Sequence, residues 1–364
     1  MKFLPVLLIL SLVAVAKEVP FYIGTYTKPG KSQGIYVGRL DTETGKLGPV
    51  VLAAEVKSPS FVALSPDGKN LYAATEAGGG AVAAFTVNAD GKLTALNSSG
   101  TGGSGTCHVW VDATGKNVLS ADYGSGNIAA MPVKADGSLG ERTAFVKFEG
   151  SGPDPARQKA PHGHSIYAEN GFVYSCDLGT DNVWIFKLDA AKGTLTPAHP
   201  PSGQVPPGAG PRHFAIHPGG KFAFANNEMA LSVTAFARDA ATGALTALQT
   251  LPTIPEGADR KGVSTAEIFC HPTGKWLYVS NRGHDSIAVF SIAADGKLTP
   301  VEVAPALVKV PRGFGIDPTG QWLVTAGQND DKIAVLKIDT ATGKLTPTGQ
   351  SAEVGSPVCI LFGR

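Results

Sequence analysis

The chain has 364 residues, with 31 Lys and Arg against 30 Asp and Glu, and therefore a formal net charge of +1. This balance argues against nucleic acid or an anionic membrane as the main partner. Hydrophobic residues make up 43% of the chain, enough for a large core, so its 45 glycines and 26 prolines indicate turns rather than disorder.

The first residues, MKFLPVLLILSLVAVA, contain one Lys, a short apolar run and the small-residue sequence Ala14, Val15, Ala16. This pattern predicts a signal peptide over residues 1–16, because the run is short for a membrane-spanning helix. A retained membrane anchor is the alternative. We therefore expect residues 17–364 to form one domain, without stable membrane insertion, in the periplasm or outside the cell.

A repeat occupies the rest of the chain. Its best copy, AEIFCHPTGKWLYVSNRGHDSIAVF, begins at Ala266, with similar copies at Arg212 and Arg312 and weaker copies near Pro59, Thr106 and His162. Turn glycines recur about 46 to 56 residues apart, a period typical of propeller blades. Each period has three short apolar runs and a weaker fourth, separated by DG, TG or GG turns, which predicts a four-stranded blade.

The two ends of the repeat predict how the ring closes. YIGTY near Tyr22 matches the second strand of other blades, so the first blade lacks its innermost strand. The tail GSPVCILF, ending at Phe362, matches SPSFVAL at Ser58 and supplies that strand. We therefore predict an all-β, seven-bladed β-propeller that is closed by pairing the C-terminal strand into the first blade, which removes two exposed sheet edges.

Polar residues recur where the first strand of each period starts and where the second strand ends. Because these two strands are antiparallel, both positions are expected at one mouth of the central channel. Aligned strand starts place four ionisable residues at one register position: His108, His164, His213 and Glu267. The residues at the starts of first strands are His108, His162, His164, Arg212, His213, Glu267 and Arg312. The residues at the ends of second strands are Glu76, Asp122, Tyr123, Asp177, Glu228, Arg282 and Gln328. Each of these residues taken singly could have a purely structural role, but so many polar side chains at one mouth favour a binding or catalytic site.

Four cysteines could form two disulfides in an exported protein, but three lie in predicted innermost strands, so buried free thiols are favoured. The chain has no CxxC and no closely spaced Cys and His pair, and we expect no metal and no other cofactor. The connection from Gly150 to Ala160 either covers the mouth or is an ordinary solvated loop, which we favour.

Several segments together resemble the lactonase propeller family, which includes bacterial 6-phosphogluconolactonases and fungal 3-carboxy-cis,cis-muconate lactonizing enzymes. They are KAPHGHS, SCDLGTDNVWIF, GPRHFAIHPGGKFAFANNE, AEIFCHPTGKWLYVSNRGHDSIAVF and PRGFGIDPTGQWLVTAGQ. The resemblance implies a catalytic set of His164, Arg212, Glu228 and Arg282. Candidates for substrate binding are His162, His213, Glu267, Arg312, Asp177 and Gln328.

The resemblance implies a lactonase whose partner is a small-molecule sugar lactone. Export is expected from the predicted signal peptide, and we expect a monomer. Glu228 or His164 is the general base on water and the other the acid, while Arg212 and Arg282 stabilise the oxyanion or hold an anionic group. The chain has no GxSxG motif for a serine nucleophile. A non-enzymatic YVTN-like interaction propeller and a muconate-type cycloisomerase are the alternatives.

Overall fold

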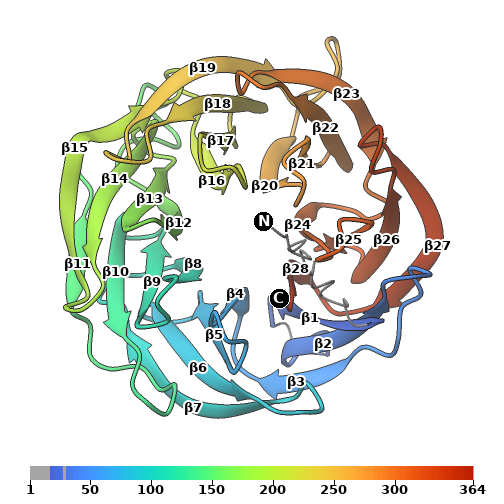
Figure 1. Ribbon diagram of the computed structural model, residues 1–364, viewed down its shortest axis with the longest axis horizontal. Helices are drawn as coiled ribbons and strands as arrows, with labels where there is room; N and C mark the ends of the chain where they lie inside the picture. Colours follow the sequence, from blue (N-terminus) through green and yellow to red (C-terminus); the bar gives the residue numbers. More distant parts are fainter. Residues whose placement is uncertain (1–16, 28–29, 364) are drawn as a thin grey trace, which may run out of the picture.

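Seven four-stranded antiparallel sheets stand around a central channel, with the first strand of each blade innermost (Figure 1). The computed structural model describes residues 17–27 and 30–363. It confirms the predicted seven-bladed β-propeller. The predicted signal peptide, residues 1–16, lies outside the described residues.

Each blade consists of four strands that follow one another outward from the channel. Blades 1 to 4, each from its innermost to its outermost strand, consist of β28 (Pro357–Phe362), β1 (Glu18–Thr25), β2 (Gly34–Asp41) and β3 (Val51–Glu55); β4 (Pro59–Leu64), β5 (Asn70–Thr75), β6 (Ala81–Val87) and β7 (Leu93–Gly100); β8 (Thr106–Val111), β9 (Asn117–Asp122), β10 (Asn127–Pro132) and β11 (Ala144–Lys147); and β12 (Gly163–Glu169), β13 (Phe172–Asp177), β14 (Asn182–Asp189) and β15 (Thr194–Gln204). Blades 5 to 7 consist, in the same direction, of β16 (Pro211–Ile216), β17 (Phe222–Asn227), β18 (Ser232–Arg238) and β19 (Leu245–Pro252); β20 (Ser264–Cys270), β21 (Trp276–Arg282), β22 (Ser286–Ile292) and β23 (Leu298–Pro305); and β24 (Pro311–Ile316), β25 (Trp322–Gly327), β26 (Lys332–Ile338) and β27 (Leu345–Glu353).

The ring closes as the repeat predicts. The C-terminal strand β28 pairs antiparallel with β1, and Phe21 lies opposite Phe362. The first blade therefore combines the two ends of the described chain, and separating its strands would open the ring. This closure leaves no unpaired inner strand at the junction of blades 1 and 7.

Adjacent blades pack face to face, which explains why their strands are apolar on both faces. Tyr278 and Val289 of blade 6, for example, share a core with Phe314 and Leu336 of blade 7. Buried tyrosines of the second strands also bridge blades: the hydroxyl of Tyr278 donates to the carbonyl oxygen of Gly343, 2.9 Å away. Such contacts fix each blade against the next and so make a rigid frame for the channel.

Each innermost strand has a β-bulge near its start, where the channel mouth lies. In blades 4, 5 and 7 the strand pairing skips one residue, which is His164, Arg212 or Arg312. A bulge re-aims the side chain of its extra residue. The bulges therefore present these three side chains differently from their neighbours along the strand.

All four cysteines are free, as expected. No helix within residues 17–27 and 30–363 is long and apolar enough to cross a membrane.

Candidate active site

A polar cavity of about 330 Å³ lies at the end of the channel where the innermost strands begin. Its walls combine innermost strand starts, second-strand ends and one connecting loop. The lining residues are Tyr26, Glu76, Gly105, Cys107, Tyr123, Gly124, Arg157, His164, Glu228, Arg282 and Arg312. The structure thus brings His164, Glu228, Arg282 and Arg312 together, and Arg212 lies directly behind Glu228.

The strand pairing corrects the register inferred from the sequence. His108 pairs with Ala121 and His213 pairs with Asn226, whereas His164 is the unpaired bulge residue between Gly163 and Ser165. His164 therefore occupies the position of Arg212 and Arg312, one residue before that of His108 and His213. This shift separates a residue that lines the cavity from residues that lie deeper in the channel.

Glu228 is the centre of the charged cluster. Its Oε1 accepts a hydrogen bond from Nη2 of Arg157 at 2.8 Å, and its Oε2 lies 2.9 Å from Nη2 of Arg282. Arg212 Nε lies 3.2 Å from the same Oε2, in ion-pair contact but without hydrogen-bond geometry. Three guanidinium groups therefore hold one nearly buried carboxylate.

The guanidinium groups decide the charge of Glu228. Burial by itself would raise the pKa of Glu228, but Arg282, Arg212 and Arg157 outweigh it and hold that pKa at about 2. Burial lowers the pKa of Arg282 to about 10, so this side chain remains cationic at neutral pH. Glu228 is thus a permanent anion and a weak base.

His164 faces this carboxylate as a neutral imidazole. Its Nε2 lies 4.0 Å from Oε2 of Glu228, and its ring meets Tyr123 edge-on at a centroid distance of 5.3 Å. Burial, followed by Arg212, His213 and Arg312, lowers the pKa of His164 well below its ordinary value. The Sγ of Cys107 lies 3.8 Å from Nδ1 of His164, but burial raises the pKa of Cys107, which keeps it a thiol. His164 is therefore uncharged at neutral pH, and a ring nitrogen can accept a proton in this cavity.

Residues 20–362 match the family described as Lactonase, 7-bladed beta-propeller. The chain belongs to this lactonase family. A 6-phosphogluconolactonase of Bacillus subtilis (strain 168) is 37% identical to this lactonase-family propeller over 346 residues, which cover 94% of this chain and 97% of the relative. A 6-phosphogluconolactonase of Formosa agariphila is 32% identical over 343 residues, covering 92% of this chain and 96% of the relative. Among solved structures, the periplasmic gluconolactonase of Pseudomonas aeruginosa has a TM-score of 0.90 at 29% identity, and the match covers 95% of this chain and 99% of that one.

A second polar layer of this lactonase-family propeller lies below the cavity. His213 Nδ1 lies 2.7 Å from Oε1 of Glu267, and both side chains are buried and outside the cavity lining. Burial raises the pKa of Glu267 to about 8 and lowers that of His213 well below its ordinary value. The ring of His213 meets that of His164 at a centroid distance of 5.4 Å. Both residues therefore border the catalytic candidates without reaching the cavity itself.

Three other candidates, Asp177, His162 and Gln328, do not line the cavity. The carboxylate of Asp177 accepts hydrogen bonds from the backbone of His162 and Gly179 and from the side chains of Thr180 and Trp184. These four donors already occupy the carboxylate, so the binding role of Asp177 stays a prediction. His162 bonds to the backbone oxygen of Tyr123 and stacks on its ring, and neither His162 nor Gln328 lines the cavity.

Sequence reasoning missed Arg157 and Tyr26 of the cavity wall. Arg157 belongs to the connection between β11 and β12, so this loop borders the mouth and is more than a solvated connection. The buried side chain of Gln158 anchors the loop to the backbone oxygen of Leu178 and to Asp181. Tyr26 directly follows β1, just as Glu76 follows β5 and Glu228 follows β17, so the repeat register itself points to Tyr26.

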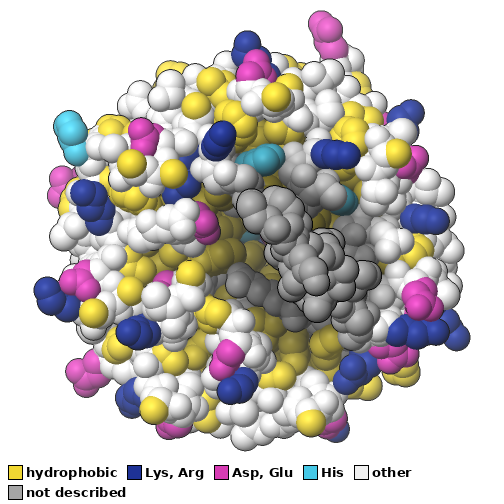
Figure 2. Space-filling view, viewed as in Figure 1, with side chains coloured by type: hydrophobic (Ala, Val, Ile, Leu, Met, Phe, Trp, Pro, Cys, Tyr) yellow, Lys and Arg dark blue, Asp and Glu magenta, His cyan; other side chains and the backbone are white. Residues whose placement is uncertain are grey.

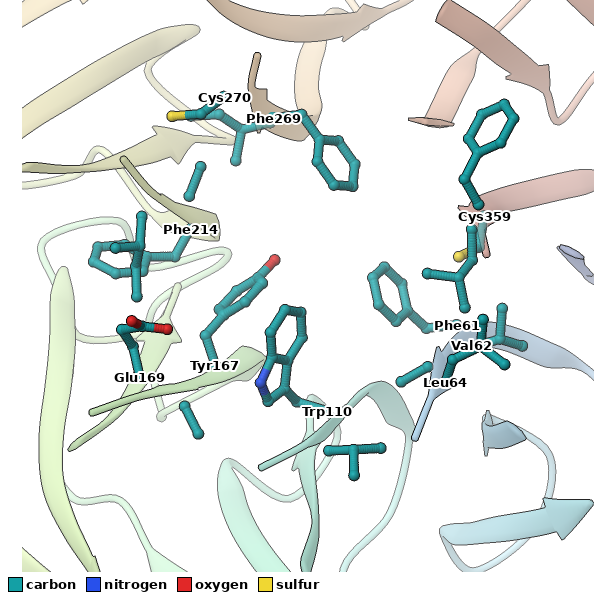
Figure 3. A pocket seen from close by; sticks show the side chains of 18 of the residues that line it. Phe61, Val62, Leu64, Trp110, Tyr167, Glu169, Phe214, Phe269, Cys270 and Cys359 are labelled. Carbon is teal, nitrogen blue, oxygen red and sulfur yellow. The ribbon is translucent and has the colours of Figure 1, made fainter. Parts of the chain in front are cut away.

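The opposite end of the channel has a different chemistry. A cavity of about 360 Å³ there is lined by side chains such as Phe61, Trp110, Tyr167 and Phe269, with Glu169 as its one charged lining residue (Figure 3). On the face shown in Figure 2, hydrophobic side chains surround the central hollow and most charged side chains lie farther out. This apolar cavity lacks an acid-base pair, so the polar cavity is the candidate active site.

No cluster of three or more His, Cys, Asp or Glu side chains in the described part of the chain has the arrangement of a metal site. The cavity instead holds its positive charge on arginines. Its four guanidinium groups, counting Arg212, face the carboxylates of Glu76 and Glu228. The site therefore carries an excess of two positive charges and is suited to anions and to negative charge that develops during a reaction.

Proposed function

We propose that the protein is an exported lactonase that hydrolyses a sugar lactone, as a 6-phosphogluconolactonase does. The observation that carries the proposal is a neutral imidazole that faces an arginine-bound carboxylate in one cavity. The names of the relatives from Bacillus subtilis and Pseudomonas aeruginosa support a lactone as substrate. A propeller that only binds other proteins has no need for such an arrangement.

In the proposed reaction, neutral His164 removes a proton from a water molecule as its oxygen bonds to the lactone carbonyl carbon. Arg282 and Arg212 stabilise the negative charge that develops on the carbonyl oxygen. The ring C–O bond then breaks, and the protonated His164 gives its proton to the departing ring oxygen. Glu228, whose pKa of about 2 makes it a poor base, orients the arginines and stabilises the protonated His164.

The test is acid release from a panel of sugar lactones by the purified mature protein. We expect His164→Asn and Glu228→Gln each to lower kcat/KM by about 100-fold or more, because both remove charge or proton transfer at the reacting centre. Circular dichroism of each variant checks that the fold is intact. A wild-type protein inactive on every lactone, or two folded variants with full activity, would refute the proposal.

Export rests on the predicted signal peptide and on the likeness to a periplasmic gluconolactonase, and it requires a mature chain that starts at Lys17. N-terminal sequencing of the protein from a periplasmic or culture fraction tests it.

A muconate-type cycloisomerase would use the same residues but would form or open a lactone of a dicarboxylate, so product analysis on such a substrate separates the two reactions.

A further inference from the structure

Arg212 and Arg312 occupy the same bulge position in blades 5 and 7, yet their surroundings differ. Arg212 is nearly buried, donates from Nη1 to the backbone oxygen of Ala266 and contacts Glu228. The guanidinium of Arg312 has no hydrogen-bond partner among the described residues. Its nearest acid is Glu76, with 3.9 Å between Nη2 and Oε1, too long for a hydrogen bond. The repeat therefore places a second guanidinium at the mouth and leaves its donors unused.

Arg312 contacts Tyr26 and Glu76, whereas Glu228 contacts Arg157, Arg212 and Arg282. Arg312 comes from blade 7, and its guanidinium sits 5.3 Å from the ring centre of Tyr26, which follows the second strand of blade 1. Glu76 follows β5 of blade 2, whereas His164, Glu228 and Arg282 belong to or directly follow strands of blades 4, 5 and 6, whose order around the ring is seen in Figure 1. The cavity thus has two polar sides, and Tyr26 holds the Arg312 side chain in place by a cation–π contact.

The charges around Glu228 and Glu76 explain why the Arg312 guanidinium has no hydrogen-bonded acceptor. Glu228 accepts from Arg157 and contacts Arg212 and Arg282, so its binding capacity is filled within its own cluster. A neutral lactone would leave the excess positive charge of the cavity unbalanced. An anionic substituent on the lactone would offset it, and a guanidinium binds phosphate or carboxylate through paired donors.

We propose that Arg312, Tyr26 and Glu76 form a second subsite, which binds an anionic substituent of the lactone remote from the reacting carbonyl. Arg312 binds the phosphate or carboxylate, while Glu76 accepts hydrogen bonds from neighbouring hydroxyl groups of the sugar. The position of the lactone ring in this arrangement rests on the proposed function. The subsite sets which lactone is preferred and takes no part in proton transfer.

The test compares the wild-type protein with Arg312→Ala and Arg312→Lys on three substrates: glucono-1,5-lactone, its 6-phosphate and a glucarolactone. The preference, measured as kcat/KM for a charged lactone relative to the uncharged one, is expected to fall by about 10- to 100-fold in Arg312→Ala, since a hydrogen bond to a charged group contributes about 1.5–3 kcal/mol. Arg312→Lys keeps the charge but loses the paired donors, so its preference lies between those of the wild type and Arg312→Ala.

Arg260→Ala is the matched control, because Arg260 is an exposed arginine in another blade connection whose side chain donates to the backbone oxygen of Ala230. Its preference should equal that of the wild type. A loss confined to the 6-phosphate or to the glucarolactone identifies which anion the subsite serves. An unchanged preference in Arg312→Ala, or a wild type that prefers the uncharged lactone, overturns the proposal.

Binding measurements separate this inference from the hydrolase proposal. If the wild type hydrolyses no lactone, the proposed function fails, and calorimetric titration with 6-phosphogluconate, glucarate and gluconate still tests the subsite. The expected result is tighter binding of the two dianionic or trianionic ligands than of gluconate, and an advantage reduced about 10-fold or more in Arg312→Ala. Equal binding of all three ligands by the wild type overturns the subsite.

Discussion

Glu267 makes the stability of this propeller depend on pH in a defined window. Burial raises the pKa of Glu267 from 4.5 to about 8 in the folded protein, so the native state holds a proton that the unfolded chain releases. Its contribution to stability is complete below pH 4.5 and is lost as the pH rises to 8. The lowered pKa of buried His108, His164 and His213 acts in the opposite direction, but only below about pH 6.5.

Between pH 6.5 and 8 the effect of Glu267 is therefore expected to dominate. Each pH unit in this window corresponds to about 1.4 kcal/mol, so the free energy of unfolding should fall by about 2 kcal/mol from pH 6.5 to 8 and then level off. Glu267→Gln should remove this slope, because the amide is neutral throughout and its oxygen can still accept from His213 and from the backbone of Ile268.

The assay is urea unfolding at half-unit steps from pH 6.5 to 8.5, with a constant m-value as the check that the same surface unfolds at each pH. Glu169→Gln, which replaces an accessible carboxylate of the apolar cavity, is the control and should keep the slope of the wild type. A wild type without a slope in this window, or a Glu267→Gln variant that retains it, would refute the reasoning.

Two further substitutions test residues around the site. Arg157→Ala should lower kcat/KM about 10-fold for charged and uncharged lactones alike, because Arg157 acts through its hydrogen bond to Oε1 of Glu228. Steady-state kinetics on both kinds of lactone test this, and a loss limited to charged lactones would contradict it. Asp177→Ala should lower the free energy of unfolding by about 2 to 4 kcal/mol, because four donors lose a buried acceptor, and should change KM by less than about 3-fold. Urea unfolding and kinetics of that variant check both parts, and a large rise in KM without loss of stability would instead support Asp177 as a substrate ligand.

The candidate site shows where sequence reasoning reaches its limit. The antiparallel first and second strands of each blade predict that His164, Glu228 and Arg282 lie at one mouth of the channel, because strand starts and strand ends meet at the same edge. The alignment of His164 with His108 and His213 was wrong by one residue. The turn after β12 is shorter than the turn of blade 5: Glu169 pairs with Phe172 across it, whereas Ile216 pairs with Ala223, so an alignment on the turn glycines shifts His164 by one residue. The hydrogen-bonded pairs show that His164 shares its position with Arg212 and Arg312.

The sequence by itself determined the strands, their grouping into seven blades and the closure of the ring by β28, because turn residues and apolar runs recur with the period of one blade. It also determined that arginines and carboxylates gather at one mouth. Only the tertiary structure decided that Arg157 reaches Glu228, that Asp177 is occupied by two backbone and two side-chain donors, and that the Arg312 guanidinium is left without a hydrogen bond to the described residues. These outcomes depend on loop paths and side-chain directions, which are set by contacts between residues far apart in the chain.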